Sequence, residues 1–151
     1  DESAALLARL PDVHQIDADS AALMSASDAL LLASGTITLE AALLARPMVV
    51  AYRVHPVSAA IARALRLLKI NRFSLPNLLA GADIVPECMQ EDCNPPRLAA
   101  ELAPLLTNAP AADAQRAALA AVAAQLPANV SARAADAIIA QFCLNEVRTT
   151  P

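Results

Sequence analysis

Residues 28–53, DALLLASGTITLEAALLARPMVVAYR, decide the fold of this chain. Residues 29–33 and 48–52 are short apolar runs of the kind that forms buried strands, and a helical pattern lies between them. A glycine-containing turn at residues 34–36 separates the first run from the helix, and Pro47 precedes the second run. This order of strand, helix and strand predicts a βαβ unit with parallel strands.

The turn between the first strand and the helix is the first candidate binding site. In a βαβ unit, ligands bind beyond the carboxyl ends of the strands, where the N–H groups of a following helix point outward. Ser34, Gly35 and Thr36 occupy that position. The chain has only 2 glycines, where ordinary usage would give roughly ten. A glycine at this turn therefore indicates a backbone that must turn sharply or be approached closely.

Glu40 is the one charged residue inside the predicted helix, which is apolar on nearly every side. That composition is typical of a buried helix, in which a carboxylate needs a partner. A capping box is excluded, because with Thr36 as N-cap the third helical residue is Leu39. Glu40 lies one turn below Thr36 on the same face. A helix tip with a carboxylate one turn below it suits the diphosphate and the ribose of a nucleotide, and an ion pair with Arg53 is the alternative.

The composition of the 151 residues bounds the possible functions. The chain is 57% hydrophobic and only 2% aromatic, which predicts one mostly helical domain with an aliphatic core. Its net charge of -4 argues against a nucleic-acid partner, since phosphate binding needs a basic surface. Cys88, Cys93 and Cys143 match no zinc or redox spacing and are expected to be free thiols. The sequence predicts no metal site, no cofactor and no membrane-spanning segment.

Helical periodicity, capping residues and prolines predict the elements outside the βαβ unit. They are a strand over 13–16, a helix from an N-cap at Asp19 or Ser20 to residue 26, a helix over 57–70, a covered loop over 73–81, a helix over 82–90, a helix from Asn94 to residue 106, a helix over 110–126 and a last helix capped by Ser131. The last helix is expected to bury Ile138, Ile139 and Phe142. The helix over 57–70 has a basic face, which suits either an anionic membrane surface or the solvated side of a helix packed on the sheet.

Two stretches of the chain resemble a known family. ASDALLLASGTITLEAALLARPMVVAYRVHP at residues 26–56, followed by FSLPNLLAG at 73–81, resembles the carboxy-terminal domain of lipid-A-disaccharide synthases, which are two-Rossmann-domain glycosyltransferases. The block ASGT-x-TLE by itself also resembles other such enzymes, including the peptidoglycan enzyme that adds GlcNAc to its lipid intermediate. The combination of PMVV-x-YR with SLPNLLAG at this separation is the more specific signal. The resemblance covers residues 20–107 well and the later helices weakly.

The resemblance implies an α/β fold, a Rossmann-like half-domain with parallel strands followed by a helix-rich carboxy-terminal part. Residues 1–145 would form part of a nucleotide-sugar-binding domain, and residues 146–151 a tail. The implied reaction transfers the sugar of UDP-2,3-diacylglucosamine to a diacylglucosamine 1-phosphate and gives lipid A disaccharide and UDP. The family's amino-terminal domain supplies the acceptor site and the proposed general base, and these residues do not include it. We therefore expect the catalytic residues to lie outside this chain, and no transfer by the chain alone.

The resemblance also implies binding residues and partners. Carried over residue by residue, the positions that match the family's motifs are Ser34, Gly35, Thr36, Glu40, Arg53 and Asn77. The turn would face the diphosphate and the carboxylate would face the ribose, while Arg53 and Asn77 would border the cleft without an assigned contact. The implied partners are the two acylated sugars and the cytoplasmic surface of the inner membrane of a Gram-negative bacterium, where the protein would be peripheral. A homodimer with exchanged carboxy-terminal segments is also implied.

Two other functions fit the sequence. One is a related UDP-sugar enzyme of the same fold, a GlcNAc transferase or an epimerase, which acylated and unacylated donors would distinguish. The other is a non-enzymatic helical interaction module, for which the alanine-rich second half is the only support. Such a module would not bind UDP, so a loss of UDP affinity on Glu40→Ala would exclude it.

Overall fold

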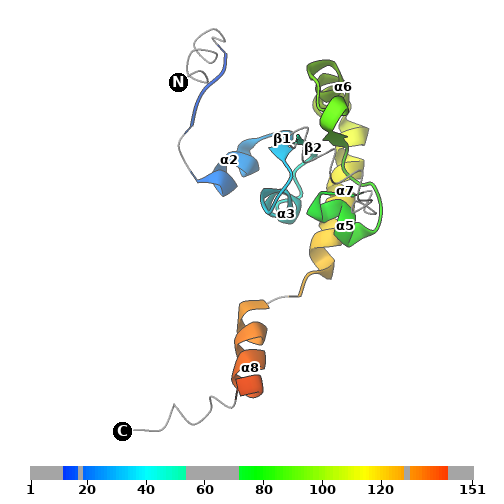
Figure 1. Cartoon of the computed structure of the whole chain (residues 1–151). Helices are drawn as coiled ribbons and strands as arrows, with labels where there is room; N and C mark the ends of the chain where they lie inside the picture. The colour runs from blue at the N-terminus through cyan, green and yellow to red at the C-terminus, as the bar shows by residue number, and fades with distance from the viewer. Residues whose placement is uncertain (1–11, 17–18, 54–71, 128–129, 143–151) are drawn as a thin grey trace, which may run out of the picture.

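The computed structural model describes residues 12–16, 19–53, 72–127 and 130–142 (Figure 1). Its elements are α2 (Ser20–Ala26), β1 (Leu30–Ala33), α3 (Ile37–Leu43), β2 (Met48–Tyr52), α5 (Leu75–Ala80), β3 (Glu87–Met89), the 3-10 helix η1 (Gln90–Asp92), α6 (Pro95–Thr107), α7 (Ala109–Gln125) and α8 (Val130–Phe142). No helix of this described part is long and apolar enough to cross a membrane. The predicted helix over 57–70 and Cys143 lie outside it.

Three parallel strands form the sheet, in the order β1-β2-β3. In the register, Leu32 pairs with Val50, which in turn pairs with Glu87. The strand predicted over 48–52 has those bounds, and the helix α3 connects it to β1. The predicted βαβ unit and the α/β, Rossmann-like fold class are therefore confirmed.

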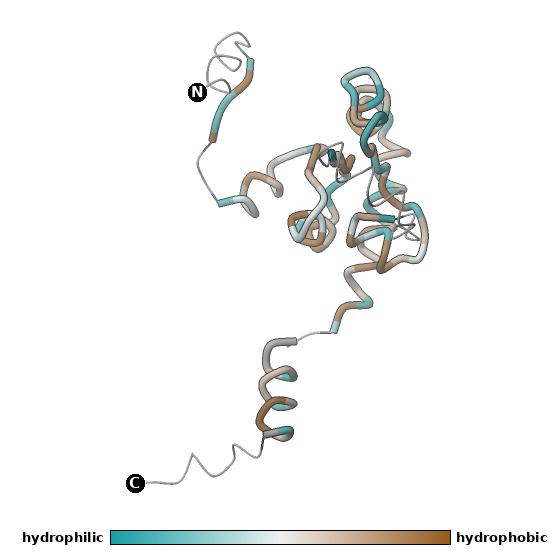
Figure 2. The backbone as a smooth tube through the Cα atoms, in the orientation of Figure 1, coloured by the Kyte–Doolittle hydropathy of each residue, from teal (hydrophilic) through white to brown (hydrophobic). Residues whose placement is uncertain are grey.

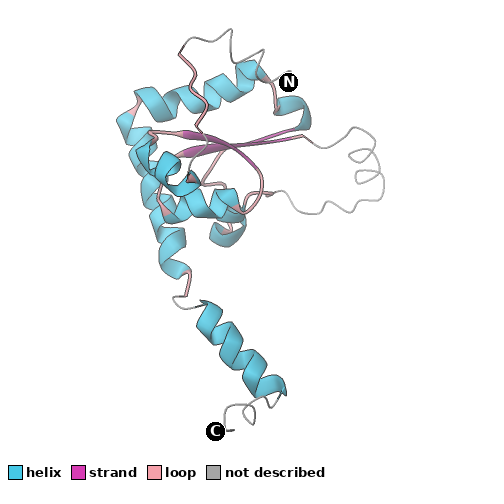
Figure 3. Cartoon of the chain, turned by 90° about the vertical axis from the view of Figure 1, so that its left-hand side faces the viewer, coloured by secondary structure: helices cyan, strands magenta, loops and turns pink. Residues whose placement is uncertain are grey.

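The central strand β2 is buried on both of its faces. Met48, Val49 and Val50 have no exposed surface. Met48 and Val50 pack in one cluster with residues of α3 and α7, whereas Val49 packs with Leu105 of α6 on the opposite face. Figure 3 shows helices on both sides of the three strands. The sequence of a strand that is covered on both faces is a continuous apolar run, and this pattern allowed β2 to be predicted from the sequence.

The helix α7 closes one side of the core. Its alanines allow a close approach to α3, and Leu119 is completely buried in the shared cluster. Gln115 reaches from this helix to the first residue of β2, where its Oε1 accepts a hydrogen bond from the Met48 N–H at 2.6 Å. The bond satisfies a buried donor at the start of the strand.

Two predicted helix starts are confirmed by their caps. The carboxylate of Asp19 accepts from the Ala21 N–H at 3.0 Å and begins α2. The amide oxygen of Asn94 accepts from the Arg97 N–H at 3.0 Å and begins α6, which has Pro95 in its first turn. Both are N-cap residue types whose oxygens satisfy helix donors.

Three of the predicted elements are wrong. Residues 13–16 form no strand. Residues 73–81 contain α5, which is capped by Ser74 and ends at Gly81 in the left-handed conformation, with φ 64. Residues 82–90 contain β3 instead of a helix. Pairing with β2 decides this last case, and such pairing between segments distant in sequence leaves no local pattern.

The helix α8 is observed where a final helix was predicted, but Ser131, its predicted cap, is its second residue, and its expected burial is only partly found. It stands apart from the other elements in Figures 1 and 3. Ile138 is 53% exposed and Ile139 is half-buried. Figure 2 shows hydrophobic residues on this separate helix. The expectation that Ile138 is buried is therefore wrong, because nothing in the described residues covers that side chain.

Candidate functional site

The three parallel strands end at one edge of the sheet. The register pairs the last residue of β1 with the fourth of β2, and the last residue of β2 with the last of β3. Ser34, Arg53 and Gln90 directly follow the three strands. The fold thus brings together two of the predicted residues with one that sequence reasoning placed in a helix. Gln90 has a positive φ of 50, an uncommon backbone conformation for a residue other than glycine.

The turn after β1 requires glycine for its backbone conformation. Gly35 has a φ of 155, and a Cβ added there would meet no atom within 4 Å. The reason for the glycine is therefore a sharp turn, and the space beside it is open. The hydrogen bonds of the turn begin with the Thr38 N–H, which donates to the Gly35 carbonyl at 3.1 Å. The N–H groups of residues 35–37 precede the first of these bonds.

The two hydroxyl groups of the turn differ in their surroundings. Ser34 Oγ donates to the Phe73 carbonyl oxygen at 3.1 Å, so its proton is engaged. Thr36 stands at the N-cap position, as predicted, but its side chain makes no capping bond, and the residue is exposed. Thr38 Oγ1 instead bonds the Gly35 carbonyl at 2.7 Å. The exposed hydroxyl at this helix tip therefore belongs to Thr36.

Glu40 is exposed, which corrects the expectation of a buried carboxylate. The helix α3 buries Thr38, Ala41 and Ala42 and leaves Leu43 54% exposed. The small side chains face the core because they allow the helix to approach the sheet and α7 closely, and the leucines remain outside. None of the ion pairs among the described residues contains Glu40 or Arg53, which is also exposed. The alternative of an ion pair between these two is not observed.

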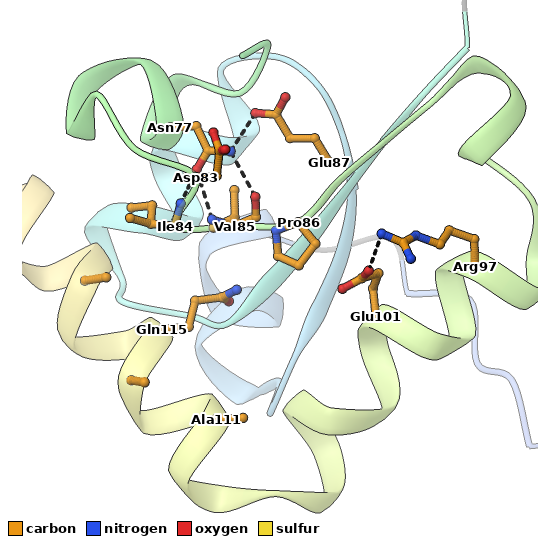
Figure 4. A pocket seen from close by; sticks show the side chains of 12 residues that line it. Asn77, Asp83, Ile84, Val85, Pro86, Glu87, Arg97, Glu101, Ala111 and Gln115 are labelled. Carbon is orange, nitrogen blue, oxygen red and sulfur yellow. Dashed lines mark hydrogen bonds and ion pairs between the residues drawn. The ribbon is translucent and has the colours of Figure 1, made fainter. Parts of the chain in front are cut away.

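Asn77 is 1% exposed and uses its full hydrogen-bonding capacity inside the protein. Its Nδ2 donates to the Val85 carbonyl at 2.9 Å and to Glu87 Oε1 at 2.8 Å. Its Oδ1 accepts from the N–H groups of Ile84 at 2.8 Å and Val85 at 2.9 Å. Figure 4 shows this side chain between Glu87 and the backbone that leads into β3. Asn77 therefore has a structural role, because its hydrogen bonds hold α5 to the third strand and to the backbone before it.

Sequence reasoning missed Glu87. Its Oε2 accepts from the Phe73 N–H at 2.9 Å, and its Oε1 accepts from the Ser74 N–H at 2.9 Å and from Ser74 Oγ at 2.6 Å. The Asn77 amide reaches the same Oε1. These partners lie 10 to 14 residues before Glu87, so no local spacing signals the interaction.

A cavity of about 610 Å³ lies near the beginning of β3, and both Asn77 and Glu87 are among the residues that line it. Figure 4 shows its lining, which includes the ion pair of Arg97 and Glu101 at 2.7 Å and the side chain of Gln115. Of its two other acids, Asp83 pairs with Arg72 at 2.6 Å, and Glu87 accepts the hydrogen bonds described above. The charged groups of the cavity are thus engaged in ion pairs or hydrogen bonds, and Ser34, Gly35, Thr36 and Glu40 are not among its lining residues.

The two described cysteines are free thiols, as predicted. Cys88 lies on β3 and is buried in a cluster with Val49 of β2 and Leu105 of α6. Burial raises the pKa of the Cys88 thiol above its usual range, and the negative charge of Glu101 raises that pKa further. A thiol in this environment stays protonated at neutral pH and is a packing group.

Comparison with known proteins identifies the family. Residues 3–142 match the family model described as lipid-A-disaccharide synthetase. The lipid-A-disaccharide synthase of Xylella fastidiosa (strain M23) is 49% identical over 125 residues, which are 83% of this chain and 32% of that protein. The synthases of Xanthomonas euvesicatoria pv. vesicatoria (strain 85-10) and Xanthomonas campestris pv. campestris (strain 8004) are 47% and 46% identical over the same share of the chain, and each is covered over 28% of its length. The chain thus spans less than a third of the curated relatives it matches, and the match over most of its own residues shows that it belongs to the lipid-A-disaccharide synthetase family.

Proposed function

We propose that this chain is the donor-binding part of a glycosyltransferase of lipid A biosynthesis. Its substrate would be UDP-2,3-diacylglucosamine, and the whole protein would transfer the sugar to a diacylglucosamine 1-phosphate, releasing UDP. Family membership supports this proposal. The observation that carries it is the exposed carboxylate of Glu40 one helical turn below an open, glycine-containing turn at the carboxyl edge of a parallel sheet.

The proposed diphosphate position is the turn of residues 34–36. The N–H groups that precede the first hydrogen bond of α3 and the exposed hydroxyl of Thr36 are donors, as an anion requires. Because the proton of Ser34 is engaged with Phe73, we assign Ser34 to holding the turn and assign the diphosphate contacts to Gly35 and Thr36. Arg53 follows the neighbouring strand and adds a positive charge at the same edge.

The proposed ribose position is beside Glu40. An ionised carboxylate only accepts hydrogen bonds, and the two hydroxyl groups of a ribose are donors that match it. Glu40 and Thr36 are joined by the first turn of α3, in which the Glu40 N–H donates to the Thr36 carbonyl at 3.2 Å. A nucleotide with its diphosphate at the turn would therefore have its ribose next to this carboxylate.

The proposal extends to the rest of the protein. The general base and the acceptor site would lie outside residues 1–151, so that residues 1–145 provide part of the nucleotide-sugar domain and residues 146–151 a tail. Since both substrates carry acyl chains, the whole protein would work at a membrane surface, which we propose to be the cytoplasmic face of the inner membrane. The exposed apolar side chain of Ile138 on α8 is compatible with a homodimer contact.

A donor comparison with the complete gene product tests this function. Purified protein is given diacylglucosamine 1-phosphate together with either UDP-2,3-diacylglucosamine or unacylated UDP-glucosamine. We expect disaccharide and UDP from the acylated donor only. Turnover of unacylated UDP-GlcNAc would instead indicate a related UDP-sugar enzyme. Disaccharide formation by residues 1–151 alone would contradict the location proposed for the base.

A further inference from the structure

We propose that Glu87 is a positioning residue for the donor site, and that it acts through the peptide group between Phe73 and Ser74. This inference rests on the proposed function of the turn at residues 34–36. Glu87 lies on β3, two residues before the strand ends, and not at the carboxyl edge itself. Its effect on a nucleotide must therefore be transmitted by other groups.

The carboxylate of Glu87 is fixed in orientation by donors to both of its oxygens. Oε2 accepts from the Phe73 N–H, while Oε1 accepts from the Ser74 N–H, the Ser74 hydroxyl and the Asn77 amide. The distances lie between 2.6 and 2.9 Å. Hydrogen bonds to a charged acceptor are roughly twice as strong as neutral ones. The segment before α5 is therefore held firmly against β3.

One peptide group connects this carboxylate to the candidate site. The N–H of the group belongs to Ser74 and donates to Glu87 Oε1. The carbonyl of the same group belongs to Phe73 and accepts from Ser34 Oγ at 3.1 Å. A peptide group is planar, so fixing its N–H also fixes the direction of its carbonyl. A charged acceptor on the N–H also polarises the group and strengthens the bond that its carbonyl accepts.

The connection joins segments that are far apart in the sequence. Ser34 precedes Phe73 by 39 residues, and Glu87 follows it by 14. Through the Phe73–Ser74 peptide group, the turn after β1 is thereby connected to the third strand, although the central strand β2 lies between β1 and β3 in the sheet. Both oxygens of Glu87 accept hydrogen bonds, whereas a glutamine side chain has one oxygen and one NH₂ group. The NH₂ group would face hydrogen-bond donors and could not replace the lost acceptor. We therefore expect Glu87→Gln to release the peptide group and, with it, Ser34.

Titration with UDP tests the inference in the complete gene product. Four proteins are compared, namely the unaltered one, Glu87→Gln, Ser34→Ala and the double variant. The matched control is Glu101→Gln, which removes a carboxylate from the same cavity and whose ion-pair partner, Arg97, lies on the same helix α6. We expect Glu87→Gln to weaken UDP binding about tenfold and Glu101→Gln to leave it within about twofold. The KM for the donor should rise with Glu87→Gln, and the KM for the acceptor should not.

The double variant separates positioning from an independent role. If Glu87 acts through Ser34, the double variant should bind UDP within about twofold of the weaker single variant. Losses that multiply would overturn the inference, as would a folded Glu87→Gln protein that binds UDP like the unaltered one. If Glu87→Gln does not fold, Ser34→Ala tests the connection by itself, because it removes the bond to the Phe73 carbonyl, and unchanged UDP affinity in that variant would also overturn the inference. Absence of UDP binding by the unaltered protein would instead refute the proposed function.

Discussion

Replacing Asn77 by Ala should destabilise the protein strongly, because the side chain satisfies buried backbone groups. Alanine makes none of its four hydrogen bonds. Glu87 would keep its other three donors, and the N–H of Ile84 would keep the Ala82 carbonyl as an acceptor at 3.1 Å. The N–H and C=O of Val85 would lose their Asn77 partner, and Val85 is 2% exposed. An unsatisfied buried group costs about 1–3 kcal/mol, so these two should cost about 2–6 kcal/mol.

Urea unfolding of the complete gene product, followed by far-ultraviolet circular dichroism, measures this loss. The matched control is Asn94→Ala, the same substitution at the N-cap of α6, where loss of a cap typically costs about 1 kcal/mol. We expect the Asn77 variant to lose at least twice as much free energy of unfolding as the Asn94 variant, in line with the magnitudes above. Equal losses in the two variants would refute the assignment of Asn77 to the internal structure. In that case its amide would be available to a ligand.

Three further predictions concern single residues. Gly35→Ala should cost about 1–2 kcal/mol in the free energy of unfolding because its φ of 155 disfavours a side chain, and an unchanged urea midpoint would contradict this. Gln115→Ala should cost about 1–3 kcal/mol, measured in the same way, because it leaves the buried N–H at the start of β2 without its acceptor; a smaller loss would mean that water replaces the amide. At neutral pH, maleimide should label the half-buried Cys93 before Cys88, as followed by peptide mass spectrometry. Rapid labelling of Cys88 at neutral pH would contradict its burial. Because the pKa of the Cys88 thiol is raised in the folded protein, this thiol favours folding at pH below its ordinary value of 9.0, and that contribution declines as the pH rises through the raised value.

Local pattern was sufficient to predict the βαβ unit and the helices that begin at good caps. The apolar run of β2 is buried on both faces, so every residue in it is informative. Asp19 and Asn94 each satisfy the N–H of a residue two or three positions later, an interaction that spacing alone reveals. The position of Ser34 at the carboxyl edge of the sheet follows from the same logic, since it only requires the end of a strand.

The missed features depend on contacts between distant residues. The segment before β3 is extended because the Asn77 amide binds the backbone of Ile84 and Val85, and this outweighs its helical composition. The exposure of Glu40 depends on which face of α3 packs on the sheet, and a helix with both alanines and leucines leaves that choice open. The role of Glu87 requires a carboxylate to meet a loop that precedes it by 13 residues.

Titration calorimetry of the complete gene product with UDP, for the unaltered protein and for Glu40→Ala, tests the central claim most directly. Asp113→Ala is the matched control, since it removes an exposed carboxylate from α7. Among the described residues, the ion-pair partner of this carboxylate is Arg116 on the same helix. We predict that UDP binds, that Glu40→Ala weakens binding about 10- to 100-fold as loss of hydrogen bonds to a charged group implies, and that Asp113→Ala has no effect. Failure of the unaltered protein to bind UDP, or equal affinity of the Glu40 variant and the unaltered protein, would contradict the proposed site.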